Sequence, residues 1–158
     1  SYHSYIFVSK GGELHDSKSY NYAHVGVYFG ILGLLTGMFW AKYTWGTYWT
    51  NDPKLNGSAI GLLIYFGYFI LRSSIEDESK KGKISSVYNV FAFSMLIPLI
   101  FILPRLTDSL HPGNGGNPGF NVYDMNSQLR LVFYPAVTGF IFLGLWISDL
   151  RLKMLKLK

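Results

Sequence analysis

An aromatic turn at residues 45–54 and one downstream histidine, His111, are the parts of this sequence best suited to chemistry. The turn reads WGTYWTNDPK. The faces and edges of Trp and Tyr rings give a flat apolar molecule a large contact area. Trp and Tyr are also enriched wherever a membrane protein crosses the water interface. The turn therefore predicts either a site for a flat hydrophobic ligand or an aromatic belt at a membrane surface.

His111 adds a group that can bind a metal. Neutral imidazole is a ligand of haem iron, and aromatic side chains pack against a porphyrin plane. A lone histidine near an interface is, however, more often a hydrogen-bonded surface residue, and this alternative stays open. Asp52, Asp108 and Asp124 are dispersed carboxylates that suit helix caps and salt bridges better than catalysis. With no nucleophile or acid–base pair beside them, we expect no enzyme.

The composition indicates an integral membrane protein. Hydrophobic residues make up 49% of the 158 residues and charged residues only 15%, and the apolar residues form long clusters. The absence of cysteine excludes disulfide frameworks and thiolate metal sites within this sequence.

Four apolar segments approach the roughly 20 residues that a helix needs to cross a bilayer. They are residues 25–43, 55–71, 84–103 and 131–150. We therefore expect an all-α, polytopic transmembrane helix bundle that forms one domain over residues 1–158, with external loops at 44–54 and 104–130. Pro98 and Pro135 lie inside spans, where a membrane bundle tolerates the kinks they cause.

The basic residues predict the orientation of this bundle. Ten of the 14 Lys and Arg residues lie in the N-terminal tail, the 72–83 loop and the C-terminal tail, which share one side of the membrane. By the positive-inside rule, both termini are cytoplasmic and the aromatic turn and His111 are external. His3, His15 and His24 fall on the opposite side. The net charge of +5 is therefore explained by topology, and we expect no nucleic-acid partner.

Two helical features follow from local spacing. After Leu103 the third span is expected to continue as a helix to His111 and to stop at Pro112-Gly113, a strong termination pattern. The turn-rich segment 112–130 could then fold over a site as a lid. In the first span, glycines with spacings of four, three and four form one stripe, which predicts close helix packing rather than a ligand groove. They are Gly26, Gly30, Gly33 and Gly37, and Gly57 and Gly61 repeat the pattern in the second span.

The aromatic turn resembles the tryptophan-rich WWD signature, about WGxWWxWDxRL, of the haem-handling membrane proteins of cytochrome c biogenesis. Thr36-Gly37, residues 40–42 and the LHPG sequence at 110–113 resemble the branch called cytochrome c maturation protein C, or haem exporter protein C. The resemblance covers residues 25–150. Tyr48 and Asn51 stand where the family commonly has Trp, and Lys54 stands in place of Arg.

This resemblance implies a function for the candidate residues. Haem b would bind transiently at the external face against Trp45, Gly46, Trp49 and Asp52, with His111 as one axial ligand of the iron. The second axial histidine would lie outside this chain. The haem would then be presented to a periplasmic haem chaperone that supplies apocytochrome c. The implied membrane partners are the subunits of an ATP-binding-cassette transporter and a small membrane subunit.

The resemblance also implies a bacterial inner-membrane protein of six helices, of which this sequence contains the C-terminal four. Residues 2–8 would then be the tail of a preceding helix. The main alternative is a membrane anchor or interaction subunit of a respiratory or transporter complex that uses the turn for docking without haem. A haem b electron-transfer anchor is disfavoured, because such anchors bury their histidines within the spans, and here only His24 lies at a span end.

Overall fold

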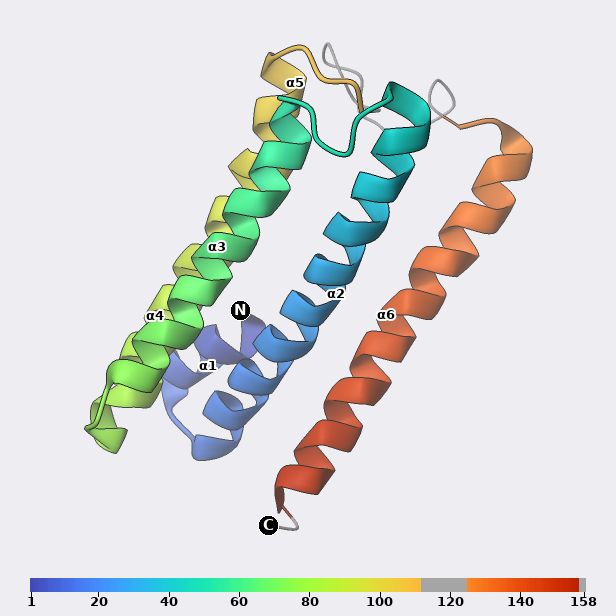
Figure 1. Cartoon of the computed structure of the whole chain (residues 1–158). Coiled ribbons are helices and arrows are strands. Elements are labelled where there is room, and N and C mark those ends of the chain that lie inside the picture. The colour runs from blue at the N-terminus through green and yellow to red at the C-terminus, as the bar shows by residue number, and fades with distance from the viewer. Residues whose placement is uncertain (112–124, 157–158) are drawn as a thin grey trace.

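A computed structural model describes residues 1–111 and 125–156, and every regular element in these ranges is a helix (Figure 1). In chain order the helices are α1 (Tyr2–Lys10), α2 (Glu13–Trp45), α3 (Pro53–Ser74), α4 (Glu78–Leu96), η1 (Ile97–Ile102), α5 (Leu103–Leu106) and α6 (Ser127–Lys156). The long helices stand side by side, with α3 packed on α4 and α6 packed on α2. The expected all-α helix bundle is confirmed.

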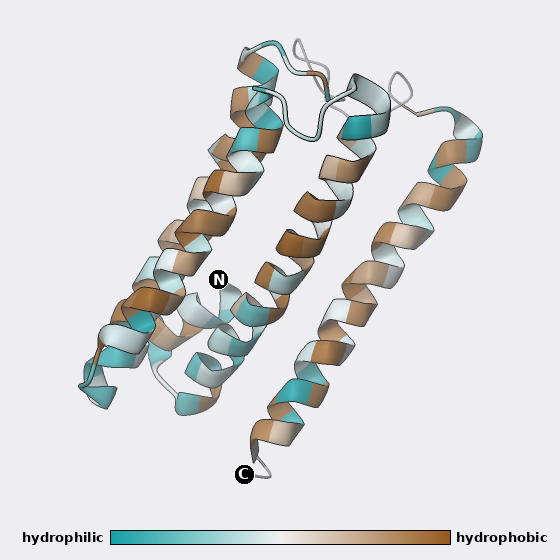
Figure 2. Ribbon diagram, in the orientation of Figure 1, coloured by the Kyte–Doolittle hydropathy of each residue, from teal (hydrophilic) through white to brown (hydrophobic). Residues whose placement is uncertain are grey.

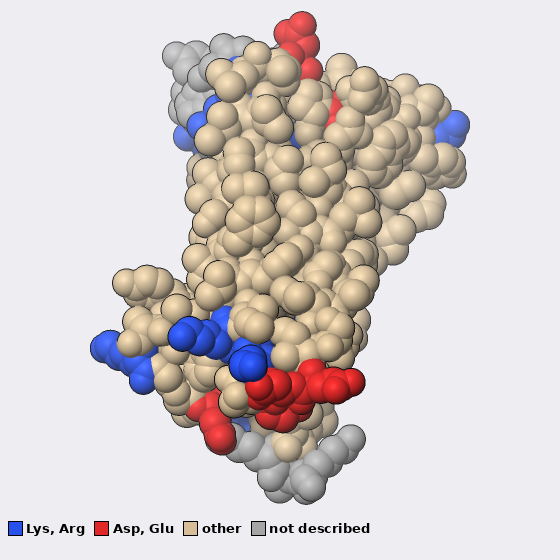
Figure 3. Space-filling view, turned by 90° about the vertical axis from the view of Figure 1, so that its left-hand side faces the viewer, with Lys and Arg blue, Asp and Glu red and all other residues tan. Residues whose placement is uncertain are grey.

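Four stretches are long and apolar enough to cross a membrane: Glu13–Trp45, Pro53–Ser74, Glu78–Leu106 and Ser127–Leu155. The four expected spans are therefore confirmed, although the helices extend beyond the boundaries taken from hydropathy because polar residues continue them at both ends. Hydrophobic residues follow the middle of the long helices (Figure 2). In the view of Figure 3, charged side chains gather at the two ends and leave an uncharged band between them.

The interior of the bundle is held by small and polar contacts, while many large apolar side chains face outward. Leu131 is 76% exposed and Phe142 is 66% exposed, as suits a helix such as α6 in lipid. The Asn21 amide donates to the carbonyl oxygen of Ser148 at 2.7 Å and so ties α2 to α6. Polar side chains inside a membrane bundle commonly make such cross-helix bonds.

The end of the bundle opposite the aromatic turn is held by a turn and an ion pair. Gly11 and Gly12, with φ of +76° and +101°, reverse the chain between α1 and α2. The Arg72 guanidinium donates to both carboxylate oxygens of Asp16, at 2.8 and 2.5 Å, which joins α3 to α2. This bidentate geometry is the strongest form that an arginine–carboxylate pair takes.

The third span does not run as a helix to His111. Pro98 lacks an N–H, and the span passes it as the π-helix η1, in which the Leu103 N–H reaches the Pro98 carbonyl. Helix α5 then ends at Leu106, because Thr107 is extended with φ −128° and ψ 161°. The predicted helix end at His111 is therefore wrong. The polar groups of residues 109–111 bond to Asp52 instead of continuing the helix. Most of the expected lid, residues 112–124, lies outside the described residues.

The glycines give two different outcomes. A Cβ on Gly57 would collide with the carbonyl oxygen of Leu99, and one on Gly61 would lie 2.7 Å from Leu96, so close packing of α3 is confirmed. In α2 only Gly30 meets a neighbour, Leu62. Within the described residues, a Cβ at Gly26, Gly33 or Gly37 would meet open space. For these three positions the prediction of tight helix packing is wrong, because they face a cavity described below.

Candidate functional site

Asp52 organises the end of the bundle that carries the aromatic turn. Asp and Pro are favoured at the N-cap and first position of a helix, and Asp52-Pro53 starts α3 in this way. One carboxylate oxygen, Oδ1, accepts from the backbone N–H groups of Lys54 at 2.9 Å and Leu55 at 3.2 Å. The side chain is only 1% exposed. The expectation that Asp52 is a helix cap is confirmed.

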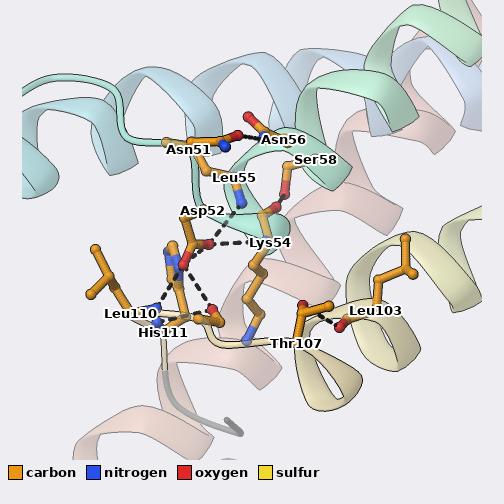
Figure 4. A network of polar contacts seen from close by, with 11 residues as sticks. Asn51, Asp52, Lys54, Leu55, Asn56, Ser58, Leu103, Thr107, Leu110 and His111 are labelled. Carbon is orange, nitrogen blue, oxygen red and sulfur yellow. Dashed lines mark hydrogen bonds and ion pairs between the residues drawn. The ribbon is translucent and has the colours of Figure 1, made fainter.

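The same carboxylate binds the loop that follows α5 (Figure 4). Its Oδ2 accepts from the Leu110 N–H at 2.7 Å and from the Ser109 hydroxyl at 2.8 Å. The Nδ1 atom of His111 lies 2.8 Å from Oδ1. Residues that are 59 positions apart in the sequence thus meet at one buried carboxylate.

The ionisation of Asp52 determines which imidazole nitrogen is free. Burial alone raises the pKa of this carboxyl group. The hydrogen bonds from Leu110, Ser109 and Leu55, together with the charge of His111, outweigh burial and hold the pKa below its ordinary value. An ionised carboxylate only accepts hydrogen bonds, so Nδ1 of His111 carries the proton toward Asp52. When the imidazole is neutral, the Nε2 lone pair of His111 is therefore available to a metal, as in carboxylate–histidine–metal arrangements.

Two tryptophans surround the imidazole. The Trp45 ring meets the His111 ring edge-on, with centroids 4.9 Å apart and planes at 81°. Trp40 lies 6.3 Å from His111 and packs edge-on against Trp45 at 5.0 Å. The sequence analysis did not include Trp40 among the site residues. Its position five residues before Trp45, slightly more than one helical turn, could have indicated it.

The remaining turn residues have different surroundings. Gly46 ends α2 with φ +82°, a conformation that side chains rarely adopt, and its carbonyl accepts from the Lys42 ammonium at 2.9 Å. Trp49 is 41% exposed. Among the predicted residues, the structure therefore places Trp45, Asp52 and His111 together. Gly46 shapes the turn beside them, and Trp49 lies at the surface.

His24 belongs to a separate region near the opposite end of α2. Its ring packs on Phe69 at 4.2 Å and on Tyr20 at 4.3 Å, and its Nδ1 lies 3.1 Å from the Tyr20 carbonyl. It precedes Trp45 by 21 residues of one helix, or roughly 31 Å at 1.5 Å per residue. His24 is therefore a packed residue remote from the external site.

Comparison with known proteins shows which family contains this chain. The model of the cytochrome c assembly protein family matches residues 10–111, which is more than half of the chain. The chain belongs to the cytochrome c assembly protein family. The matched segment contains the aromatic turn and ends at His111, so both partners of the Asp52–His111 contact lie within it. The resemblance seen in the aromatic turn is confirmed.

Individual relatives of this cytochrome c assembly family member carry the name heme exporter protein C. The protein of Haemophilus influenzae is 26% identical over 140 residues, covering 86% of this chain and 54% of the relative. Those of Bradyrhizobium diazoefficiens and Escherichia coli are each 27% identical, over 135 and 133 residues. These two matches cover 85% and 84% of the chain, and 51% and 52% of the relatives. The chain spans about half the length of the curated relatives it matches.

Proposed function

We propose that this chain binds haem b transiently at the external membrane face and presents it for cytochrome c maturation. The observation that carries the proposal is the Asp52–His111 contact, which orients an imidazole and leaves its Nε2 free beside two tryptophans. The family description, cytochrome c assembly protein, and the relatives' name, heme exporter protein C, support it.

The residues present fit haem in distinct ways. Bound haem supplies an iron that accepts an axial nitrogen, and His111 Nε2 is that nitrogen. Trp45 packs against the porphyrin ring and also against the imidazole of His111. Gly46 allows the tight turn at the end of α2. Asp52 acts through His111, because its own carboxylate is buried beneath the imidazole. Trp49 is exposed and can cover the outer porphyrin edge. The second axial ligand comes from outside this chain.

The cellular setting is part of the same proposal. The protein resides in a bacterial inner membrane, with the haem site periplasmic and both ends of this chain cytoplasmic. It works with ATP-binding-cassette transporter subunits, a small membrane subunit and a periplasmic haem chaperone. The excess of Lys and Arg at the inner end supports the orientation.

A haem difference spectrum tests the proposal. The purified protein, titrated with haemin, should show the shifted Soret band of imidazole-ligated iron. His111→Ala should lose this band and regain part of it with added imidazole, which can enter the vacated axial position. His24→Ala is the matched control and should bind haem normally. Loss of haem in His24→Ala with retention in His111→Ala would refute the assignment.

A docking function without haem is the second candidate. The observation that favours it is the exposure of aromatic residues at the external end: Tyr43 is 89% exposed and Tyr48 is 49% exposed. Exposed aromatic side chains are enriched in protein interfaces. A protein that binds no haem in either oxidation state, yet loses a membrane partner when Tyr43 and Tyr48 are changed to Ser, would establish docking.

A further inference from the structure

A slot of about 490 Å³ runs along α2 toward His111. It is lined by residues of α2, α3 and the α4–η1 span, together with Ser1 and His111. The glycine face of α2 forms one wall, and Leu55, Leu62, Tyr65, Leu96 and Ile100 belong to the opposite side. His111 and Lys54 line the outer part, and Asn89 lines the inner part. A volume of this size is typical of sites for small organic ligands.

The shape of the slot follows from the glycines. Gly26, Gly33 and Gly37 have open space where a side chain would stand. The eleven residue steps from Gly26 to Gly37 extend over roughly 17 Å of helix at 1.5 Å per residue. At these three positions a flat molecule can lie close to the helix backbone, whereas Leu62 occupies the space at Gly30 between them.

An unsatisfied amide oxygen is the second, independent feature of the slot. Asn89 is only 2% exposed, and its Nδ2 donates to the hydroxyls of Ser4 and Ser19, both at 2.9 Å. Its Oδ1 has no hydrogen-bond partner among the described residues. Asn89 lines the slot, so a donor that enters beside it, such as the hydroxyl of a carboxylic acid, would satisfy this oxygen.

We propose that the slot admits porphyrin from the bilayer side, so that haem reaches His111 through the bundle rather than from external water. This inference rests on the proposed function. The apolar macrocycle slides against the glycine wall of α2. Asn89 accepts a hydrogen bond from a protonated propionic acid group at the inner end. Lys54 at the outer end attracts the propionates once they ionise near the interface.

The arrangement around His111 supports entry from this direction. The imidazole lines the slot, while Trp45 and Trp40 pack against it from the aromatic turn. A ligand arriving through lipid keeps its apolar ring out of water during transfer, which avoids the cost of exposing that surface. In this arrangement the aromatic turn covers the site on its water-facing side, and haem does not enter through it.

The first experiment compares two routes of delivery to the full chain in lipid vesicles. Haemin is either dissolved in the vesicle lipid or supplied from external water on albumin, and the growth of the ligated Soret band is timed. Gly33→Leu and Gly37→Leu fill the slot and should slow uptake from lipid by about tenfold or more, the effect of a misfit in an apolar site. Gly139→Leu is the control, because position 139 on α6 faces open space.

The outcomes separate this inference from the proposed function. His111→Ala should lose the band by both routes; if it does not, the proposed function fails, whatever the slot does. If both slot variants take up lipid-borne haemin as fast as Gly139→Leu, the slot is not the route. Circular dichroism melts of each variant confirm that it folds.

A labelling experiment keeps the inference falsifiable if the leucine variants misfold. The chain has no cysteine, so Gly33→Cys and Gly139→Cys each carry one thiol. A membrane-permeant maleimide should label both, and haemin should protect only the thiol at position 33. A thiol at position 33 that is unreactive before haemin is added would mean that another helix fills the slot. That result, or equal protection at both positions, overturns the proposal.

Discussion

At the scale of residues, the central feature is one carboxylate with two tasks. Asp52 caps α3 through Lys54 and Leu55 and binds His111 and its neighbours. Each hydrogen bond to a charged acceptor is stronger than a neutral one. The helix start and the candidate ligand are therefore held by the same group, and a change in its charge should affect ligand geometry before it affects the fold.

Asp52→Asn separates these tasks. Asparagine caps helices about as well as aspartate, so α3 should remain intact. The cap uses Oδ1, so the Asn amide nitrogen stands at the Oδ2 position, where its N–H opposes the Leu110 N–H instead of accepting from it. The loop that carries His111 should then loosen, and the negative charge that holds the Nδ1 proton of His111 is lost. Haem affinity should fall by about 10–100-fold, as for other groups that orient a metal ligand. Asp77→Asn, at the start of α4, is the matched control because Asp77 also caps a helix. Unchanged haem titration in Asp52→Asn would show that the carboxylate does not orient His111.

Trp45 and Trp49 should not be equivalent. Trp45 packs on His111, whereas Trp49 is exposed. Aromatic packing contributes about 0.5–1.5 kcal/mol beyond buried area, so Trp45→Ala should weaken haem binding by about three- to tenfold. Trp49→Ala should have a smaller effect. Parallel haemin titrations measure both, and a larger loss in Trp49→Ala would move the porphyrin to the outer surface of the turn.

The pH dependence of the ligand-free chain follows from Asp52. Its pKa is lower in the folded protein, so its stabilising contribution is complete above the unfolded value of about 3.9 and is lost as the pH falls through the folded value. This contribution should therefore persist from pH 7 to pH 5. Thermal melts in detergent should show an Asp52-dependent loss only below about pH 4. An Asp52-dependent loss between pH 7 and pH 5 would show that the pKa is raised instead.

At the scale of elements, the glycines of α3 and those of α2 have different surroundings. Gly57 of α3 lies against the backbone of η1, whereas Gly26, Gly33 and Gly37 of α2 face the slot. A backbone carbonyl cannot move aside as a side chain can. The α3–η1 contact is therefore rigid, and it holds the loop that carries His111 near the start of α3.

Gly57→Ala tests this contact. The added methyl group would overlap the Leu99 carbonyl oxygen, so the two helices must separate. We expect a loss of about 1–3 kcal/mol in stability, the usual cost of overpacking. Gly139→Ala adds the same methyl group in open space and should leave the melting temperature nearly unchanged. Equal melting temperatures for the two variants would show that α3 and η1 are not in contact.

At the scale of the whole molecule, four spans place the aromatic turn and His111 at one end and most basic residues at the other. The Arg72–Asp16 pair joins α2 and α3 at the basic end, and the Asp52 contacts hold the end with the aromatic turn. At each end a charged side chain with several hydrogen bonds therefore holds the helices together, and the slot lies in the apolar part between the ends.

Single-cysteine labelling tests the orientation of these spans. Thr47 and Lys80 are both exposed and lie at opposite ends. In intact cells, Thr47→Cys should react with an impermeant thiol reagent added outside. Lys80→Cys should react only after the cells are opened, because the positive-inside rule places it in the cytoplasm. External labelling of Lys80→Cys would invert the topology and remove His111 from the periplasmic face.

The sequence alone determined the class of this protein, its four spans and its family. Apolar length and the distribution of charge are local quantities, and the aromatic turn is a contiguous stretch. Trp45 and His111 were candidates from their residue types, Asp52 was added to the site by the resemblance, and the structure places the three together. The contribution of Trp40 was not recognised, because ring packing depends on how a helix end meets a distant loop.

Only the tertiary structure decided where the helix before His111 ends and what the glycine stripe does. The sequence around Leu106 is compatible with a longer helix, but the bonds from residues 109–111 to Asp52 favour an extended loop. The glycine spacing is the same for a packed helix and for an open wall. Whether a neighbour approaches depends on α3 and the α4–η1 span, and those helices approach only Gly30 closely. Local sequence patterns therefore could not predict which distant segments contact one another.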